Sequence, residues 1–172
     1  MLADGLGHGP QAARASSAAV DAVRAAPHLP PADLLRRLNG ALRGTRGAAV
    51  AVAQLDLDAG QLSFAGVGNI GARLFRGDSW QGLVSRPGIV GTHLPAHLPP
   101  QRQPWTHDCL LVLHSDGLPS RWSTGPAVHD PSSLDPAVIA ASIVRDASSP
   151  ARPVRDDTAV VVLSPFPWDR SS

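Results

Sequence analysis

A run of apolar residues near the middle of the chain, residues 47–57 (GAAVAVAQLDL), most restricts the folds that this sequence can adopt. The run is rich in β-branched valine, and successive apolar positions would give a strand that is apolar on both faces. Such a strand must be covered by other layers on both sides. A turn at residues 58–60 (DAG) and the alternating pattern of residues 61–67 predict an antiparallel hairpin with this strand.

Two helices are predicted to form one covering layer. Residues 11–26 follow Pro10, which suits the first turn of a helix, and they carry small apolar residues at helical spacing. Residues 31–42 begin after a second proline and carry three leucines as an apolar stripe. The small side chains of the first helix would let it pack closely on a sheet.

The remaining elements are predicted from shorter patterns. Residues 76–78 (RGD) favour a tight turn, so a second hairpin is expected around them and would continue an antiparallel meander. Residues 85–108 are rich in proline and histidine and are expected to hold no helix. The other expected elements are a helix over residues 134–147 and strands ending at residue 3 and spanning residues 109–113 and 159–163.

Length and charge limit the class of protein. The 172 residues fit one compact domain, expected over residues 1–164 and followed by a polar tail at 165–172. The net charge of +1 and the scattered arginines predict no nucleic-acid binding. There is no run of 18 apolar residues and no signal peptide, so we expect neither a membrane span nor export. A single cysteine, Cys109, agrees with a cytoplasmic location.

Three acidic positions border predicted strands, namely Asp4, Asp116 and Asp156. The chain has no glutamate and no lysine, so carboxylate chemistry must use aspartate, and a lysine Schiff base is excluded. Converging carboxylates without basic partners repel one another, and the usual remedy is a hard divalent cation such as Mg²⁺ or Mn²⁺. Each position alone is more typical of a turn than of a functional site.

Four motifs carry a resemblance to a known family: residues 2–9 (LADGLGHG), 64–70 (FAGVGNI), 113–118 (LHSDGL) and 155–162 (RDDTAVVV). In this order they resemble the SpoIIE-type branch of the PPM, or protein phosphatase 2C, superfamily of metal-dependent protein phosphatases. The sequence is most similar to the small bacterial members that reset stress-response signalling by dephosphorylating proteins with STAS domains. The resemblance covers nearly the whole chain.

The resemblance implies a fold, a reaction and a ligand set. The fold would be α+β, a four-layer α-β-β-α sandwich of two antiparallel sheets flanked by helices. The reaction would be hydrolysis of phosphoserine or phosphothreonine on a signalling protein by attack of a metal-bound water, with two Mn²⁺ or Mg²⁺ ions. Asp4 would bridge the metals, the carbonyl of Gly5 would bind one of them, and Asp116 and Asp156 would be further ligands, with Asp157 less favoured than Asp156.

The beginning of the chain departs from the family pattern. Members normally carry another metal-binding aspartate on a strand before the Asp-Gly motif, whereas this sequence starts three residues before Asp4. We therefore expect a domain that is short at its N-terminus and lacks one metal ligand. The alternative function is that of a non-catalytic, phosphatase-like module that binds a phosphoprotein partner.

Other polar residues are candidates for proton transfer, nucleophilic attack or metal binding. His8 and His114 could donate a proton to the leaving oxygen, but a structural hydrogen bond is the stronger reading for each. Ser115 lacks the Gly-x-Ser-x-Gly elbow of a nucleophile and is expected to serve the turn. His93 and His97 have the spacing of metal ligands on a helix, which the neighbouring prolines disfavour.

A phosphate-binding or dinucleotide-binding loop is a rival reading for residues 5–9. The sequence GLGHG precedes a predicted helix, as such loops do. Its glycine spacing, however, is G-x-G-x-G and not the G-x-G-x-x-G of dinucleotide-binding folds.

Overall fold

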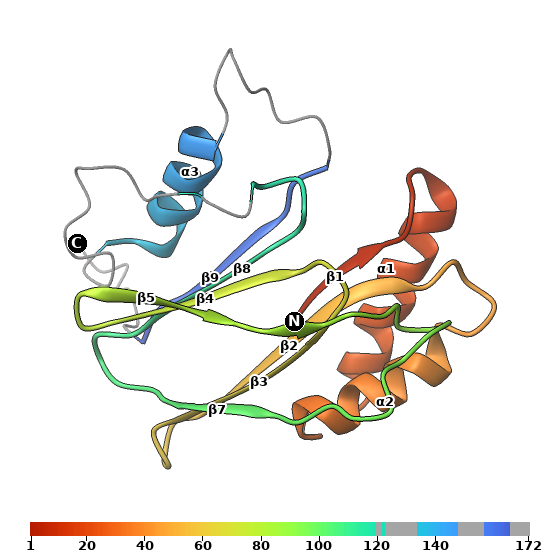
Figure 1. The fold of residues 1–172 in the computed structure, drawn as a ribbon, viewed down its shortest axis with the longest axis horizontal. Coiled ribbons are helices and arrows are strands. Elements are labelled where there is room, and N and C mark those ends of the chain that lie inside the picture. The colour runs from red at the N-terminus through yellow and green to blue at the C-terminus, as the bar shows by residue number, and fades with distance from the viewer. Residues whose placement is uncertain (120–121, 123–133, 148–156, 166–172) are drawn as a thin grey trace. The chain divides into compact units, whose positions relative to one another are not determined.

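The computed structural model describes residues 1–119, 122, 134–147 and 157–165 of the chain (Figure 1). Its elements form two compact units. The first unit comprises Met1–Ile70 and Val84–Trp105, and the second comprises Gly71–Leu83 and Thr106–Ser172. Within the described residues there are three α-helices and two sheets, so the predicted α+β class is confirmed.

The first unit is built on a five-stranded sheet. Its order is β1-β2-β3-β6, and β7 also pairs with β3. The pairs are antiparallel except for the short parallel pair of β3 and β6. The predicted hairpin is confirmed, because β2 and β3 pair along their length around residues 58–60. The strands are β1 (Leu2–Gly5), β2 (Ala48–Asp56), β3 (Gln61–Val67), β6 (Ser85–Arg86) and β7 (Gln101–Pro104).

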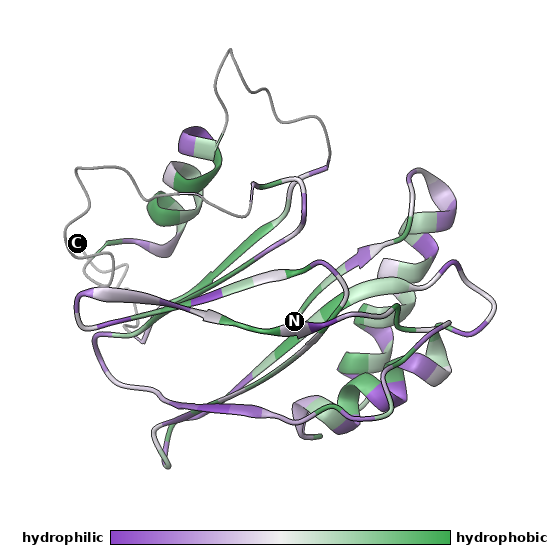
Figure 2. Cartoon of the chain, in the orientation of Figure 1, coloured by the Kyte–Doolittle hydropathy of each residue, from purple (hydrophilic) through white to green (hydrophobic). Residues whose placement is uncertain are grey.

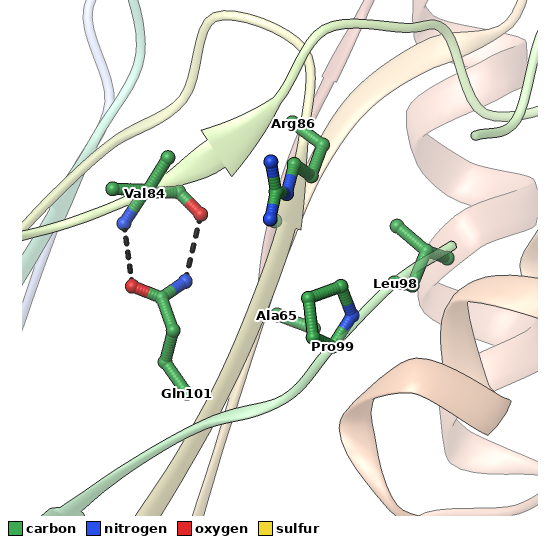
Figure 3. Close-up of a pocket in the computed structure, with 7 residues that line it drawn as sticks. Ala65, Val84, Arg86, Leu98, Pro99 and Gln101 are labelled. Carbon is green, nitrogen blue, oxygen red and sulfur yellow. Dashed lines mark hydrogen bonds between the residues drawn. The ribbon is translucent and has the colours of Figure 1, made fainter. Parts of the chain in front are cut away.

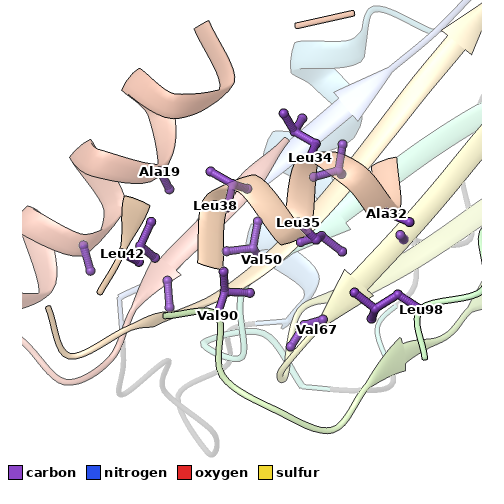
Figure 4. Close-up of a cluster of buried hydrophobic side chains, with 14 residues drawn as sticks. Ala19, Ala32, Leu34, Leu35, Leu38, Leu42, Val50, Val67, Val90 and Leu98 are labelled. Carbon is purple, nitrogen blue, oxygen red and sulfur yellow. The ribbon is translucent and has the colours of Figure 1, made fainter. Parts of the chain in front are cut away.

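Two helices, α1 (Pro10–Arg24) and α2 (Pro31–Ala41), pack against this sheet. The buried positions of α1 are all alanines, which permits the close approach expected from the sequence. Leucines of α2 fill the space over β2 and β3 (Figure 4). The buried core of the first unit consists of Ala15, Ala19, Ala32, Leu34, Leu35, Leu38, Leu42, Ala48, Val50, Val52, Ala65, Val67, Val90 and Leu98.

The second unit contains a four-stranded antiparallel sheet of order β5-β4-β8-β9 and one helix, α3 (Pro136–Ala147). Residues of α3 pack on this sheet through two isoleucines one helical turn apart, Ile139 and Ile143. The strands differ in hydropathy: β8 is apolar and buried, whereas β7 of the first unit is polar (Figure 2). The strands are β4 (Gly71–Arg76), β5 (Ser79–Leu83), β8 (Leu110–His114) and β9 (Val160–Leu163).

Two sequence predictions about the strands need correction. The two hairpins do not form one continuous meander, because β3 and β4 belong to different sheets. The chain changes sheet at residues 68–70, where Gly68 has a φ of 92° and lies so close to Ala49 that a side chain at Gly68 has no room. Residues 85–108 hold no described helix, as expected, but they supply β6 and β7. Both strands are short and polar, so no apolar alternation marks them.

None of the helices in the described part of the chain is long and apolar enough to cross a membrane. Cys109 is buried and forms no disulfide. It directly precedes β8, whereas the sequence predicted it as the first residue of that strand.

Candidate functional site

The first candidate position, Asp4, lies in β1 of the first unit. It is half-buried and faces Ala49 in the antiparallel register of β1 and β2. Gly5 follows opposite Ala48 and ends the strand. A glycine-rich loop then leads into α1, and Leu6 continues the ladder by donating its N–H to the carbonyl of Gly47 at 3.0 Å. The carboxylate of Asp4 therefore comes from a fixed strand and not from a mobile turn.

Gly5 is held tightly by the helix that follows it. Its N–H donates to Oγ of Ser16 at 3.0 Å, and this hydroxyl donates in turn to the carbonyl of Ala12 at 3.3 Å. A Cβ atom at Gly5 would collide with the carbonyl oxygen of Ala12. The N–H of Gly5 is thus satisfied by α1, and its backbone is fixed at the end of β1.

The second candidate position, Asp116, lies in the second unit and is exposed, two residues after the end of β8. The preceding residue, Ser115, forms three hydrogen bonds with the segment before β9. Its N–H donates to the carbonyl of Ala159 at 3.0 Å, and its Oγ accepts the N–H of Ala159 at 3.0 Å. Oγ of Ser115 also donates to the carbonyl of Asp157 at 3.3 Å. These bonds support the predicted structural role of Ser115 in place of a nucleophilic one.

The same segment lies beside the residue after Asp116. A Cβ atom at Gly117 would stand 2.5 Å from the carbonyl oxygen of Asp157 and 2.5 Å from Oγ1 of Thr158. The fold thus places two predicted motifs, about 40 residues apart in the sequence, side by side at the same end of the β8–β9 pair. Asp156 lies outside the described residues, so its predicted role stays a prediction. Asp157 is described and exposed.

His114 occupies a buried position next to the Asp116 turn. Its Nδ1 lies 2.9 Å from the carbonyl of Ser115, and because a carbonyl can only accept, Nδ1 carries the proton. Burial lowers the pKa of this imidazole, and the charge of Arg73 lowers it further, whereas the bond to Ser115 opposes the shift. The ring packs edge-on against Trp122, with centroids 5.9 Å apart. This environment favours the structural role that the sequence suggested over proton donation.

The other histidine candidates are exposed, unlike His114. His8 is exposed in the loop after β1, and His93 and His97 are exposed in a stretch without helix. The predicted objection to a His93–His97 metal pair on a helix is therefore confirmed. Within the described residues no three histidine, cysteine or aspartate side chains gather in a group that could hold a metal.

The rival dinucleotide reading of residues 5–9 is excluded by topology. Dinucleotide-binding folds require a parallel βαβ unit around the glycine loop. Here β1 pairs with β2 in the antiparallel sense, and two helices separate them in the chain.

The donor types present fit a hard divalent cation. In the first unit Asp4 supplies a carboxylate and Gly5 supplies a carbonyl whose own N–H is already bonded. In the second unit Asp116 supplies a carboxylate. Mg²⁺ and Mn²⁺ prefer oxygen ligands of this kind. A Cβ atom at Gly5 or Gly117 would collide with a neighbouring backbone carbonyl. These close contacts fix the backbone next to the carboxylates of Asp4 and Asp116.

Two cavities of the first unit were not foreseen from the sequence. One, of about 470 Å³, is lined by residues from separate segments, including Leu6, Asn69 and Ala49, the register partner of Asp4. The other, of about 340 Å³, is bounded by Arg86 and by Gln101, whose amide pairs with both backbone groups of Val84 at 2.8 Å (Figure 3). Both collect residues from separate strands, so no local motif marks them.

Comparisons with solved structures show the fold. A chain solved in connection with the bacterial stressosome, a modular system adapted to control secondary messenger signalling, is 28% identical with a TM-score of 0.79; the match covers 93% of this chain and 80% of that one. RsbX, crystallised with magnesium, is 22% identical with a TM-score of 0.74 over 93% and 77% of the two chains. The serine/threonine phosphatase PstP/Ppp of Mycobacterium tuberculosis is 14% identical with a TM-score of 0.71 over 93% and 85%.

Sequence comparisons give the family. No curated protein matches the chain. The family model for Stage II sporulation protein E (SpoIIE) matches residues 1–165, which include all four motifs quoted above. The resemblance predicted from those motifs is therefore confirmed, and the chain belongs to the SpoIIE family of PP2C-type phosphatase domains.

Proposed function

We propose that the chain is a metal-dependent protein phosphatase that hydrolyses phosphoserine or phosphothreonine on a bacterial signalling or stress-response protein. The observation that carries the proposal is the match of the SpoIIE family model over residues 1–165, because this range includes Asp4, Asp116 and Asp156. The stressosome chain and the PstP/Ppp phosphatase with similar folds support the same class of substrate. A protein with a STAS domain is the substrate that we favour.

The proposed ligands are the carboxylates of Asp4, Asp116 and Asp156 and the carbonyl of Gly5. The RsbX structure with magnesium supports Mg²⁺ or Mn²⁺ as the ion. When bound, such ions supply Lewis acidity to a water nucleophile and to the phosphoryl oxygens. The chain itself holds Gly5 through Ser16 and fixes the turn at Asp116 through Ser115.

The finer fold assignments belong to the same proposal. We assign residues 1–164 to one phosphatase domain with a tail at 165–172, and we propose that its sheets stack as a four-layer α-β-β-α sandwich. The similar folds of RsbX and PstP/Ppp support this arrangement. A cytoplasmic location is supported by the cysteine content, because the single cysteine, Cys109, cannot form an internal disulfide and agrees with a reducing compartment.

The experiment measures phosphate release from p-nitrophenyl phosphate and from a phosphoserine peptide, with Mn²⁺, with Mg²⁺ and with EDTA. We expect turnover only with metal. Asp4→Asn and Asp116→Asn should each lower kcat/KM by roughly a hundredfold or more, since even outer partners of metal ligands cost about 10–100-fold. Asp58→Asn, in an exposed turn of the first unit, is the matched control and should leave the rate unchanged.

Turnover in EDTA, or full activity of Asp116→Asn, would contradict the proposed mechanism. Binding of Mn²⁺ and of a phosphopeptide without any turnover would support the alternative function, a phosphoprotein-binding module.

A further inference from the structure

Arg46 lies at a fixed point in the connection between α2 and β2. The residue before it, Thr45, accepts the N–H of Gly47 on its Oγ1 at 3.0 Å and donates the same hydroxyl to the carbonyl of Leu42 at 2.7 Å. The residue after it, Gly47, has a φ of 81°. A Cβ atom added to Gly47 would stand 2.7 Å from the carbonyl oxygen of Val90. The backbone on both sides of Arg46 is therefore held in place.

The guanidinium of Arg46 packs on the loop that follows Asp4 and Gly5. A Cβ atom added to Gly7 would stand 2.6 Å from Nη1 of Arg46. The strand register explains this contact, because Asp4 pairs with Ala49 and each further step of the ladder brings Arg46 closer to the position opposite Gly7. Gly7 has a φ of 85°, so its backbone conformation favours glycine, and the exposed side chain of Arg46 lies against it.

In the part of the chain that the structure describes, no carboxylate forms an ion pair with this guanidinium. Arg46 is exposed, and among the described residues it forms no ion pair and no hydrogen bond. An arginine presents five N–H donors in a planar fork that matches two phosphate oxygens at once. A positive group with open donors, packed against a loop next to a carboxylate and a carbonyl, suits a phosphoryl dianion.

We infer that Arg46 binds the phosphoryl group of the substrate beside Asp4 and Gly5, which deepens the proposed function and rests on it. Arg46 is three ladder positions from the partner of Asp4, or roughly 10 Å along the strand at about 3.3 Å per residue. The contact of Nη1 with Gly7, two residues after Gly5, places the guanidinium on the same loop as the proposed ligands. Because the arginine side chain is exposed, it can turn from Gly7 toward a phosphoryl group bound at Gly5.

The test measures binding of inorganic phosphate to the full chain in saturating Mg²⁺ by calorimetric titration, which does not require turnover. Arg46→Ala should weaken phosphate binding by roughly 10- to 100-fold, the range expected for charge-assisted hydrogen bonds. Arg46→Lys keeps the positive charge but loses the planar guanidinium. Its affinity for phosphate should therefore lie between those of the unmodified chain and Arg46→Ala. Arg43→Ala, an exposed arginine of the same connection, is the matched control and should bind phosphate like the unmodified chain.

Two controls separate a binding role from a structural one. Thermal unfolding of Arg46→Ala and its titration with Mg²⁺ alone should match those of the unmodified chain. Equal phosphate affinity of Arg46→Ala and the unmodified chain would overturn the inference and leave the phosphatase proposal standing. Phosphate binding that depends on Arg46, in a chain without turnover, would contradict the phosphatase proposal alone, whereas no phosphate binding by the unmodified chain would contradict both.

Discussion

The substitution Gly5→Ala tests how the loop after β1 is held against α1. The added methyl group would collide with the carbonyl oxygen of Ala12, which belongs to the helix backbone and cannot turn away. The β1 strand and α1 must therefore separate, and this movement also breaks the 3.0 Å bond from the N–H of Gly5 to Ser16. The φ of Gly5 is not in the left-handed region, so alanine brings no backbone strain of its own.

The two losses give the size of the effect. Overpacking in a tight site costs about 1–3 kcal/mol, and a lost hydrogen bond costs about 0.5–1.5 kcal/mol. Together they predict that Gly5→Ala lowers the free energy of unfolding by about 2–4 kcal/mol. For a chain of this length each kcal/mol moves Tm by about 2–4 °C, so Tm should fall by roughly 4–16 °C.

Urea denaturation and thermal unfolding followed by circular dichroism measure this change. Gly40→Ala is the matched control, because Gly40 is an exposed residue of α2 with nothing within 4 Å of an added Cβ. Alanine there should raise the stability by about 0.5–1 kcal/mol through helix propensity. If Gly5→Ala unfolds within 0.5 kcal/mol of the unmodified chain, the steric argument is wrong and α1 is more loosely seated than the structure indicates.

Three further predictions concern packing, charge and pH. Leu35→Ala empties a fully buried position under α2 and should cost about 2–5 kcal/mol in urea denaturation. Arg73→Ala removes a guanidinium that lies 5.2 and 4.6 Å from two tryptophan ring centroids; stability should fall by about 1–2 kcal/mol, and tryptophan fluorescence should shift to the red. Hydrogen bonds from Thr106 and Gly77 lower the pKa of Asp108 below its ordinary 3.8, so its stabilising contribution is present above that pH and is lost as the pH falls below it. The difference in Tm between the unmodified chain and Asp108→Asn, measured at pH 7, should therefore shrink as the pH falls below 3.8.

Apolar patterning explains which elements the sequence could predict. The β2–β3 hairpin follows from a buried run, a turn of small and polar residues and an alternating partner, and the observed strands match the predicted ranges within one residue at each end. Strand β7 (QRQP) carries no such pattern, because it is an edge strand whose side chains are exposed or half-buried. Its position depends on pairing with β3, which is tertiary information.

In the candidate site, too, some features could be predicted from the sequence and others depend on tertiary structure. Residue type and motif order identified Asp4 and Asp116 at strand ends, where the structure has them. The packing of Gly117 against Asp157 depends on the register of β8 and β9, and the contact of Arg46 with Gly7 depends on that of β1 and β2. A shift of one residue in the strand register would replace the residue that contacts Gly117 or Gly7. Motif recognition alone therefore could not predict these contacts.

The glycines of the site show why a motif and a ligand set are different things. Every amino acid has a backbone carbonyl, so the proposed metal ligand at position 5 does not itself require glycine. At Gly5 and Gly117 the requirement comes from the backbone carbonyls of Ala12 and Asp157, which leave no room for a side chain, and at Gly7 it comes from the positive φ of 85°. Loss of activity in a glycine variant would therefore report a displaced loop. Only a change in a carboxylate or in Arg46, made in a chain that keeps its stability, can separate ligand binding from packing.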